Sequence, residues 1–232
     1  MKKYLPFLVG IVVATTLVLA TEGYAEGPKW ILYDNFNSGG INNNLWTTNS
    51  SSAVISVAEG KAKFEHIPGR PNLSSWLGIK MAPETVKGVK VKVIVESCSG
   101  DVRARIGSFV GKVDDNYVWD DLNLQASIIS PRIYGNLGVL GPLPGLPFRY
   151  NLFYGEFIRP LEIIGNTFTI AMTFLGNKVT YEVDDLGEIE YKLPEDLSPL
   201  TDNNYYFKGI GTRSTNGDGP CVVYFDDVYI LR

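Results

Sequence analysis

Histidine and cysteine are scarce in this chain of 232 residues, which holds one histidine, His66, and two cysteines, Cys98 and Cys221. Three such side chains fall short of the four ligands that a structural zinc site usually takes. A Ser-His-Asp mechanism would depend on His66, and the sequence contains no Gly-x-Ser-x-Gly nucleophile elbow. We therefore predict neither a zinc centre nor a catalytic triad.

Basic residues are not in excess either, because 21 Lys and Arg stand against 25 Asp and Glu and the formal net charge is −4. A nucleic-acid-binding domain usually carries a basic face, so this balance argues against a nucleic-acid partner. No stretch of the sequence resembles a linker, and the length suits one large β domain. We expect one domain, residues 26–232.

The N-terminus has the three parts of a secretory signal: Lys2 and Lys3, an apolar run over 4–20, and small residues up to Ala25. We therefore predict a signal peptide over 1–25, with the protein exported to the periplasm or the cell exterior. The apolar run is shorter than the roughly 20 residues that span a bilayer, although an uncleaved anchor remains an alternative.

Amphipathic helices of ordinary length are missing after residue 26, because apolar residues recur at spacing two and turn residues interrupt every run. This pattern predicts an all-β protein, an antiparallel β-sandwich or jelly roll. Residues 89–98 and 101–110 are expected to pair as a hairpin around Ser99-Gly100. The other expected strands cover 60–65, 168–174, 179–184, 188–193, 205–211 and 222–231.

The two cysteines lie at the ends of strand-like runs, VKVKVIVESC and CVVYFDDVYIL. If these strands are neighbours, Cys98 and Cys221 can form a disulfide, which persists in an oxidising compartment. Two separate buried thiols are the alternative.

Residues 114–157 are the exception to the strand pattern, because proline and glycine occur at close intervals among aromatic side chains. Long irregular stretches in compact domains are often functional loops. Sugars stack on flat aromatic faces and bond to nearby carboxylates and amides, so this segment is our candidate glycan site, unless its aromatics only anchor the loop. The candidate ligand-binding residues are Tyr117, Trp119, Asp120, Asp121, Asn123, Tyr134, Tyr150 and Tyr154.

Both ends of the mature chain resemble a known superfamily. The stretch YDNFNSGGINNNLWTTNSSSAVISVAEGKAKFE resembles the start of concanavalin A-like lectin and glucanase domains, and VVYFDDVYIL and GNKVTYEVDDLGEIEYKL resemble the last strand and a hairpin of carbohydrate-binding jelly rolls. The resemblance implies a concanavalin A-like, laminin G-like sandwich, with Phe36, Trp46 and Phe64 packed between two sheets. It also implies an optional structural calcium, for which Asp34 and Asp227 are the candidate ligands. The alternative is that Asp226 or Asp227 caps a strand or bonds within a turn.

An acidic hairpin over 179–193 is the sharpest local feature. If residues 185–187 form its turn, Asp184 faces Glu188 and Glu182 faces Glu190. The four carboxylates could be a solvated face, a calcium site or a catalytic group. Laminarinase-like hydrolases of the resembled superfamily carry Glu-x-Asp-x-x-Glu or Glu-x-Asp-x-Glu, with the first Glu as nucleophile and the last as acid/base. Glu182-x-Asp184 matches only the first half, so we do not transfer the activity.

We therefore predict an exported, non-catalytic module that binds a polysaccharide or cell-surface glycan and requires no cofactor. An envelope protein that binds another protein is the first alternative, through the apolar segment 138–148 with Val139, Leu140, Leu143, Leu146 and Phe148. A glycoside hydrolase or lyase is the second.

Overall fold

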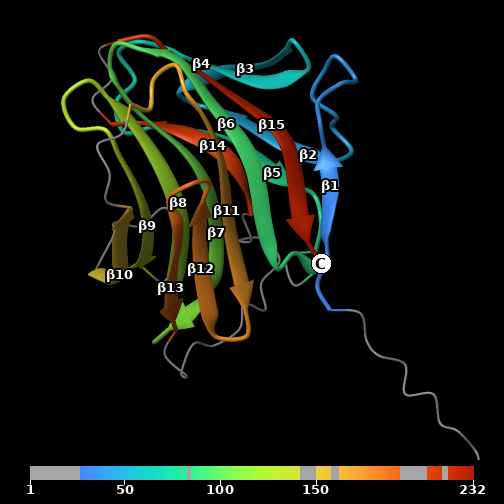
Figure 1. Cartoon of the computed structure of the whole chain (residues 1–232), viewed down its shortest axis with the longest axis vertical. Helices are drawn as coiled ribbons and strands as arrows, with labels where there is room; N and C mark the ends of the chain where they lie inside the picture. The colour runs from blue at the N-terminus through green and yellow to red at the C-terminus, as the bar shows by residue number, and fades with distance from the viewer. Residues whose placement is uncertain (1–26, 83–84, 142–149, 158–161, 194–207, 216–218) are drawn as a thin grey trace, which may run out of the picture.

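The computed structural model describes residues 27–82, 85–141, 150–157, 162–193, 208–215 and 219–232. These residues form two antiparallel sheets packed face to face, a concanavalin A-like jelly-roll sandwich (Figure 1). No helix among them is long and apolar enough to cross a membrane. The predicted signal peptide lies outside the described residues.

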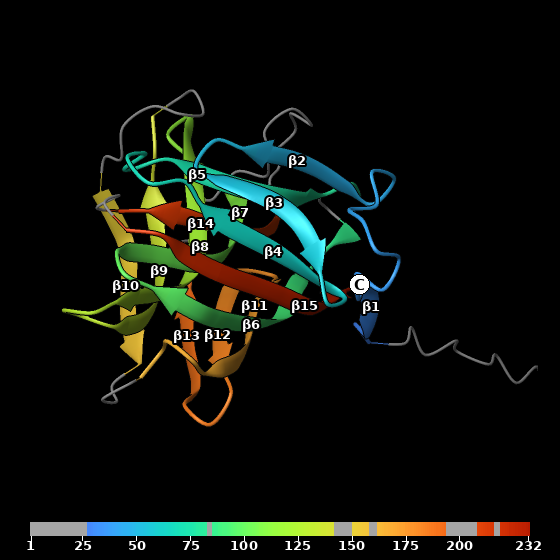
Figure 2. The same ribbon diagram turned by 90° about the horizontal axis from the view of Figure 1, so that it is seen from above.

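Sheet A has eight strands. Its centre is formed by the chain's long last strand beside β6 (Gly88–Cys98), as Figure 2 shows from above. β1 (Trp30–Asp34) and β4 (Lys61–His66) both pair with the other edge of this last strand, β15 (Cys221–Leu231). The order is β13 (Gly187–Lys192), β12 (Lys178–Val183), β11 (Thr167–Leu175), β6 (Gly88–Cys98), β15 (Cys221–Leu231), β4 (Lys61–His66) and β3 (Ala53–Ala58), with β1 (Trp30–Asp34) on β15.

Sheet B has seven strands and carries the longest antiparallel ladder, between β7 (Asp101–Val113) and β8 (Asn116–Ser127). The order is β10 (Tyr150–Phe157), β9 (Arg132–Val139), β8 (Asn116–Ser127), β7 (Asp101–Val113), β14 (Gly209–Ser214), β5 (Ser74–Ile79) and β2 (Trp46–Ser50).

The core lies between the inward faces of the two sheets. Phe36, Trp46 and Phe64 are fully buried there, which confirms the prediction drawn from the resemblance. Burial of each such side chain contributes roughly 2 to 3 kcal/mol. Successive side chains of a strand point to opposite faces of the sheet. Val89, Val91 and the other odd-numbered valines of β6 therefore all point into the core, as the sequence predicts.

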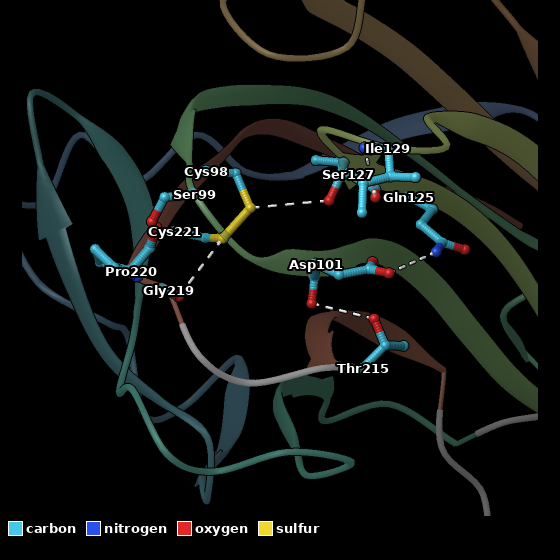
Figure 3. Close-up of a disulfide and its surroundings, with 11 residues drawn as sticks. Cys98, Ser99, Asp101, Gln125, Ser127, Ile129, Thr215, Gly219, Pro220 and Cys221 are labelled. Carbon is cyan, nitrogen blue, oxygen red and sulfur yellow. Dashed lines mark hydrogen bonds between the residues drawn. A yellow bond between two sulfur atoms is a disulfide. The ribbon is translucent and has the colours of Figure 1, made fainter.

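Cys98 and Cys221 stand directly opposite each other on β6 and β15 and form the predicted disulfide (Figure 3). The bond links positions 123 residues apart in the chain. It therefore joins the end of an early strand to the start of the last one, in the middle of sheet A.

The predicted hairpin of 89–98 with 101–110 is wrong. The two segments are strands β6 and β7, but β6 belongs to sheet A and β7 to sheet B. The Ser99-Gly100 turn therefore carries the chain from one sheet to the other. Alternation in sequence reports which side of a strand is buried, and it does not report which strand lies alongside.

The prediction that 114–157 is irregular is also wrong. Outside 142–149, which are not among the described residues, most of this segment forms β8, β9 and β10 of sheet B. Its strand character is masked because β8 is buried on both faces, with mostly apolar residues toward the core and mostly polar residues on the other side. Glycines in β9 have a packing role: a Cβ on Gly135 would lie 2.5 Å from the Tyr181 ring of sheet A.

Candidate functional site

A cleft of about 640 Å³ lies on the face of sheet B that is turned away from sheet A. Five neighbouring strands, β10, β9, β8, β7 and β14, and the start of β5 contribute its lining. The lining residues are Asn72, Ser74, Arg103, Arg105, Trp119, Asp121, Arg132, Tyr134, Asn136, Leu140, Asn151, Tyr154 and Arg213.

The strand register arranges these side chains in rows across the sheet. Because successive side chains alternate between faces, the cleft receives every second residue of each strand. One row runs from Arg213 through Arg103 and Gln125 to Arg132. The next row contains Arg105, Asn123 and Tyr134, and the third contains Asp121, Asn136 and Tyr154.

Two tryptophans lie over glycines at one end of the cleft. The rings of Trp76 and Trp119 meet edge to face with centroids 5.8 Å apart. A Cβ on Gly107 would lie 2.5 Å from Trp119, and a Cβ on Gly211 would lie 2.4 Å from Trp76. Glycine at these two positions therefore allows the indole rings to pack directly against the backbone of the sheet.

Arg105 is a buried cationic side chain of the cleft, with 5 % of its surface exposed. Its guanidinium lies 4.2 Å from the Trp76 ring centroid, pairs with Asp121 at 3.3 Å and donates to Ser74 Oγ at 2.8 Å. Burial lowers the pKa of Arg105 to about 10, although the charge of Asp121 opposes this shift. The residue stays cationic at neutral pH.

Asp121 is held by three donors at once. Its Oδ2 accepts from Arg105 Nη1 and, at 3.1 Å, from Trp119 Nε1, while its Oδ1 accepts from Asn123 Nδ2 at 2.7 Å. A carboxylate with both oxygens bonded inside the protein organises its neighbours. Asn123 is fully buried, and its own Oδ1 has no hydrogen-bond partner among the described residues.

Tyrosines form the opposite wall of the cleft. The Tyr134 and Tyr154 rings lie 5.2 Å apart, and the Arg132 guanidinium lies 5.2 Å from the Tyr134 centroid. Burial raises the pKa of Tyr134 to about 12, so its hydroxyl remains protonated and can donate at neutral pH. Tyr154 is 43 % exposed, and its hydroxyl donates to Glu156 at 3.0 Å.

The candidate ligand residues predicted from the sequence are only partly brought together. Four of the eight line the cleft, namely Trp119, Asp121, Tyr134 and Tyr154, and Asn123 is buried beside Asp121. The remaining three, Tyr117, Asp120 and Tyr150, do not line it.

Each of these three has another environment. Tyr117 is buried, with its ring 5.7 Å from that of Phe109. Asp120 points the other way, into the core, where it accepts a hydrogen bond from Tyr181. Tyr150 is 46 % exposed near the edge of sheet B. Asp120 was misplaced because consecutive residues of a strand face opposite sides, so Asp120 and Asp121 cannot share one site.

The arginines were missed as site residues. Arg103 and Arg105 alternate with the inward Val102, Ala104 and Ile106, so the sequence does place both on one face of a strand. What it does not show is that Arg132 and Arg213 come from strands on either side of the β7–β8 pair. That information lies in the pairing of strands distant in sequence.

β8 also carries a motif that sequence inspection passed over. Asp121, Asn123 and Gln125 occupy the spacing of Glu-x-Asp-x-Glu, and amides replace carboxylates at the second and third positions. Gln125 Nε2 donates to Asp101 at 2.9 Å, and its Oε1 accepts from Arg132. The residues at the two ends of the motif are thus engaged with neighbouring arginines.

The acidic hairpin lies in sheet A, away from the cleft, and its predicted register is wrong. Glu182 faces Glu188, and Glu190 faces Thr180, because the turn is formed by 184–186 rather than 185–187. Asp184 therefore leaves the carboxylate row and accepts from the Thr169 backbone amide at 2.9 Å. An ion pair with Lys178 holds Glu190.

The two candidate calcium ligands lie on neighbouring strands, since Asp34 is opposite Val228. Asp34 accepts from Trp46 Nε1 at 2.7 Å and from the Phe36 amide at 2.9 Å, and Asp227 pairs with Lys92 at 2.7 Å. Among the described residues, no three His, Cys, Asp or Glu side chains are grouped as metal ligands.

The apolar segment 138–148 falls largely outside the described residues. Within its described part, Val139 belongs to β9 and is buried in the core, while Leu140 lines the cleft. Leu143, Leu146 and Phe148 belong to the part that is not described.

Neither a protein-family model nor a curated protein matches the sequence. Solved structures are similar in fold. Porphyranase B from Zobellia galactanivorans superposes with a TM-score of 0.61 at 9% identity, over 88% of this chain and 93% of the porphyranase. SCLam, a non-specific endo-β-1,3(4)-glucanase of family GH16, gives 0.60 at 11% identity, over 89% and 91%.

An alginate lyase in complex with alginate tetrasaccharide has a TM-score of 0.50 at 10% identity, over 89% of this chain and 97% of the lyase. At such identities the likeness establishes the fold alone. The fold expected from the N-terminal and C-terminal motifs, a concanavalin A-like jelly roll, is thereby confirmed.

Proposed function

We propose that this protein is a non-catalytic binding module that recognises a polysaccharide in the cleft of sheet B. The observation that carries the proposal is that aromatic side chains and polar groups line the same cleft. Trp119 and Tyr154 present rings to the cleft, and Asn136, Asn151 and the arginines lie between and beside them. Pyranose rings bind through such a combination of stacking and hydrogen bonds.

The similar structures include proteins whose names state an action on polysaccharides or their fragments. This likeness supports a carbohydrate ligand, because the cleft of this chain lies on a fold that these proteins share. One architecture hosts many functions, so the residues of the cleft carry the argument.

The number of carboxylates in the cleft favours binding without cleavage. Glycosidases that use two carboxyl groups hold them about 5 to 9.5 Å apart on either side of the bond that is broken. Asp121 is the single carboxylate in the described lining, and three donors already occupy its oxygens. A second carboxylate would have to come from elsewhere.

Export belongs to the same proposal. A disulfide such as Cys98–Cys221 persists in an oxidising compartment, and the N-terminal 25 residues have the pattern of a signal peptide. Sequencing the N-terminus of the protein recovered from the periplasm or medium tests this. We expect it to begin at Glu26, whereas an intact Met1 in a cytoplasmic fraction would contradict export.

The binding proposal is tested by a polysaccharide screen of the purified protein. The screen contains neutral polymers (a β-1,3(4)-glucan, dextran, galactomannan) and acidic ones (alginate, polygalacturonate, hyaluronan, chondroitin sulfate, kappa-carrageenan). We expect at least one polymer to bind, and Trp119→Ala to weaken that binding about tenfold or more. Tyr224→Ala, on β15 in sheet A, is the matched control and should bind normally.

The same samples decide between binding and cleavage. A binding module leaves the length of the bound polymer unchanged, as measured by size-exclusion chromatography after prolonged incubation. Shortening of the polymer would contradict the non-catalytic part of the proposal. Absence of binding across the whole screen would contradict the proposal itself.

A further inference from the structure

We infer that the ligand of the cleft is an acidic polysaccharide, whose sugars carry carboxylate or sulfate groups. This inference rests on the proposed function and names the chemical class of its ligand. It comes from the charge of the cleft, which is opposite in sign to that of the chain.

Four guanidinium groups line the cleft against a single carboxylate, Asp121, whereas the chain as a whole carries a formal charge of −4. Asp121 is engaged by Arg105. Within the described part of the chain, no acidic side chain forms an ion pair with Arg103, Arg132 or Arg213. The cleft is therefore a local concentration of positive charge on an acidic protein, and such a cleft attracts anions.

The strongest observation for an anionic ligand is that two like charges are placed opposite each other. Arg213 and Arg103 stand directly opposite each other in the β14–β7 ladder. Residues opposed in this way have Cβ atoms about 4.5 to 5.5 Å apart, and like charges there destabilise a sheet. The positive charges of Arg213 and Arg103 also act to lower the pKa of Arg105. An anion placed between them would relieve this repulsion.

The donors needed to hold that anion are present and unused. The Nε atoms of Arg103, Arg105 and Arg213 are all buried, and none has a hydrogen-bond partner among the described residues. Arginine presents a planar fork of donors that matches the paired oxygens of a carboxylate or sulfate. Asn123 lies in the row of side chains next to that of Arg103. Its Oδ1 is also buried and has no hydrogen-bond partner among the described residues, so it can accept a hydrogen bond from a sugar hydroxyl.

A single-stranded nucleic acid would also combine negative charge with rings that stack on aromatics. The acidic balance of the chain disfavours it, because a long polyanion would meet acidic surface beyond the cleft. A single-stranded oligonucleotide is therefore included in the test as a competing ligand.

The test starts from the acidic polymers in the screen and compares each one that binds with a neutralised form on the same backbone. Carboxylates are reduced to alcohols in alginate, polygalacturonate and hyaluronan, and sulfates are removed from kappa-carrageenan. We expect binding to fall at least tenfold on neutralisation, and to weaken steeply with salt. The polymer class that responds distinguishes a carboxylate ligand from a sulfate ligand.

Two arginine variants locate the effect. Arg103→Gln and Arg213→Gln should each weaken binding of the acidic polymer about tenfold, because each removes a charged donor. The free protein should at the same time resist urea at least as well as the wild type, since one of two opposed charges is gone. Arg70→Gln, at an exposed position outside the cleft, should change neither property.

Several results would overturn the inference. If neutral polymers bind as tightly as acidic ones and the arginine variants bind normally, the ligand is a neutral glycan and the proposed function stands. Tighter binding of the oligonucleotide would replace the ligand class altogether. Failure of every polymer would remove both the inference and the proposed function.

Discussion

The Tyr181 hydroxyl of β12 donates a hydrogen bond to the Asp120 carboxylate of β8 and so joins the two sheets through the core. Both side chains are 0 % exposed, and Asp120 Oδ2 has no partner among the described residues. Burial raises the pKa of Asp120 well above its usual range, although the bond from Tyr181 acts in the opposite direction. The neighbouring Asp121, which faces the cleft, is thus placed by a residue anchored in the core.

The raised pKa of Asp120 predicts a loss of stability with rising pH. The folded protein holds this proton more tightly than the unfolded chain, whose Asp has a pKa near 3.9, so the free energy of unfolding falls as pH rises above about 4. Asp120→Asn keeps an acceptor for Tyr181 and cannot ionise. We expect the variant to be at least as stable as the wild type at pH 8, with a flatter pH profile in urea unfolding.

Tyr181→Phe provides the contrast to this variant. It removes the donor and leaves the buried carboxylate without its bond, which should cost about 1 to 3 kcal/mol at pH 8. If Asp120→Asn were less stable than the wild type by a similar amount, the carboxylate would be charged and favourable in the core, contrary to the argument.

Strand positions and faces could be predicted where one face is apolar and the other is solvated. β6, β12 and β15 show this alternation clearly, and each was found within a few residues. β8 was missed because both of its faces are buried, so its polar residues read as loop residues. The signal was present in Leu122, Leu124 and their polar neighbours at spacing two.

The cleft could be predicted only in part, because it depends on pairing between distant strands. Trp119 and Tyr134 were recognised by their chemistry, and they lie 15 residues apart on strands that pair directly. Arg213 reaches the same cleft from β14, more than 70 residues further along the chain. Local patterns assign a side chain to a face, but the neighbour across a ladder is set by the whole fold.

His66 predicts the opposite pH dependence to Asp120. It is 5 % exposed at the end of β4, and burial lowers its pKa to about 4. The unfolded chain, with a pKa near 6.5, binds this proton more readily, so stability is lost as pH falls from about 6.5 to 4. At pH 5 the loss relative to pH 7.5 should be about 2 kcal/mol.

His66→Gln isolates this contribution, since glutamine does not titrate. The measurement is the free energy of urea unfolding at pH 7.5 and pH 5 for both proteins. The variant should lose about 2 kcal/mol less than the wild type between these values. Equal losses would show that His66 is protonated in the folded protein without penalty.

The Cys98–Cys221 disulfide predicts a large effect of reduction, because it closes most of the chain into one loop. The two residues are 123 positions apart, and cross-linking a loop of this size restricts the unfolded chain strongly. We expect the double variant with both cysteines changed to serine to be less stable by about 2 to 5 kcal/mol. Urea unfolding with and without reductant checks this.

Reductant should have the same effect on the wild type as the double substitution and no effect on the double variant. An unchanged unfolding midpoint for the reduced wild type would mean that the bond contributes nothing to stability. Binding of a polysaccharide should survive reduction below the unfolding transition, because neither cysteine lines the cleft.

Gly107 of sheet B lies directly beneath the tryptophan rings at one end of the cleft. An added Cβ would lie 2.5 Å from Trp119 and 2.8 Å from Trp76, so both rings would have to move away from the backbone. Their edge-to-face contact and the bond from Trp119 Nε1 to Asp121 would be disturbed together. Gly107→Ala should therefore weaken polysaccharide binding about tenfold or more, as for direct loss of Trp119, with a cost of about 1 to 3 kcal/mol in stability.

Gly40→Ala is the matched control, because nothing lies within 4 Å of the added methyl group. It should change stability by less than about 0.5 kcal/mol and leave binding intact. Near-ultraviolet circular dichroism of the tryptophans should change for Gly107→Ala and not for Gly40→Ala. If Gly107→Ala bound normally with an altered tryptophan spectrum, the positions of the two rings would not matter to the ligand, and recognition would depend on the arginines and Tyr154 instead.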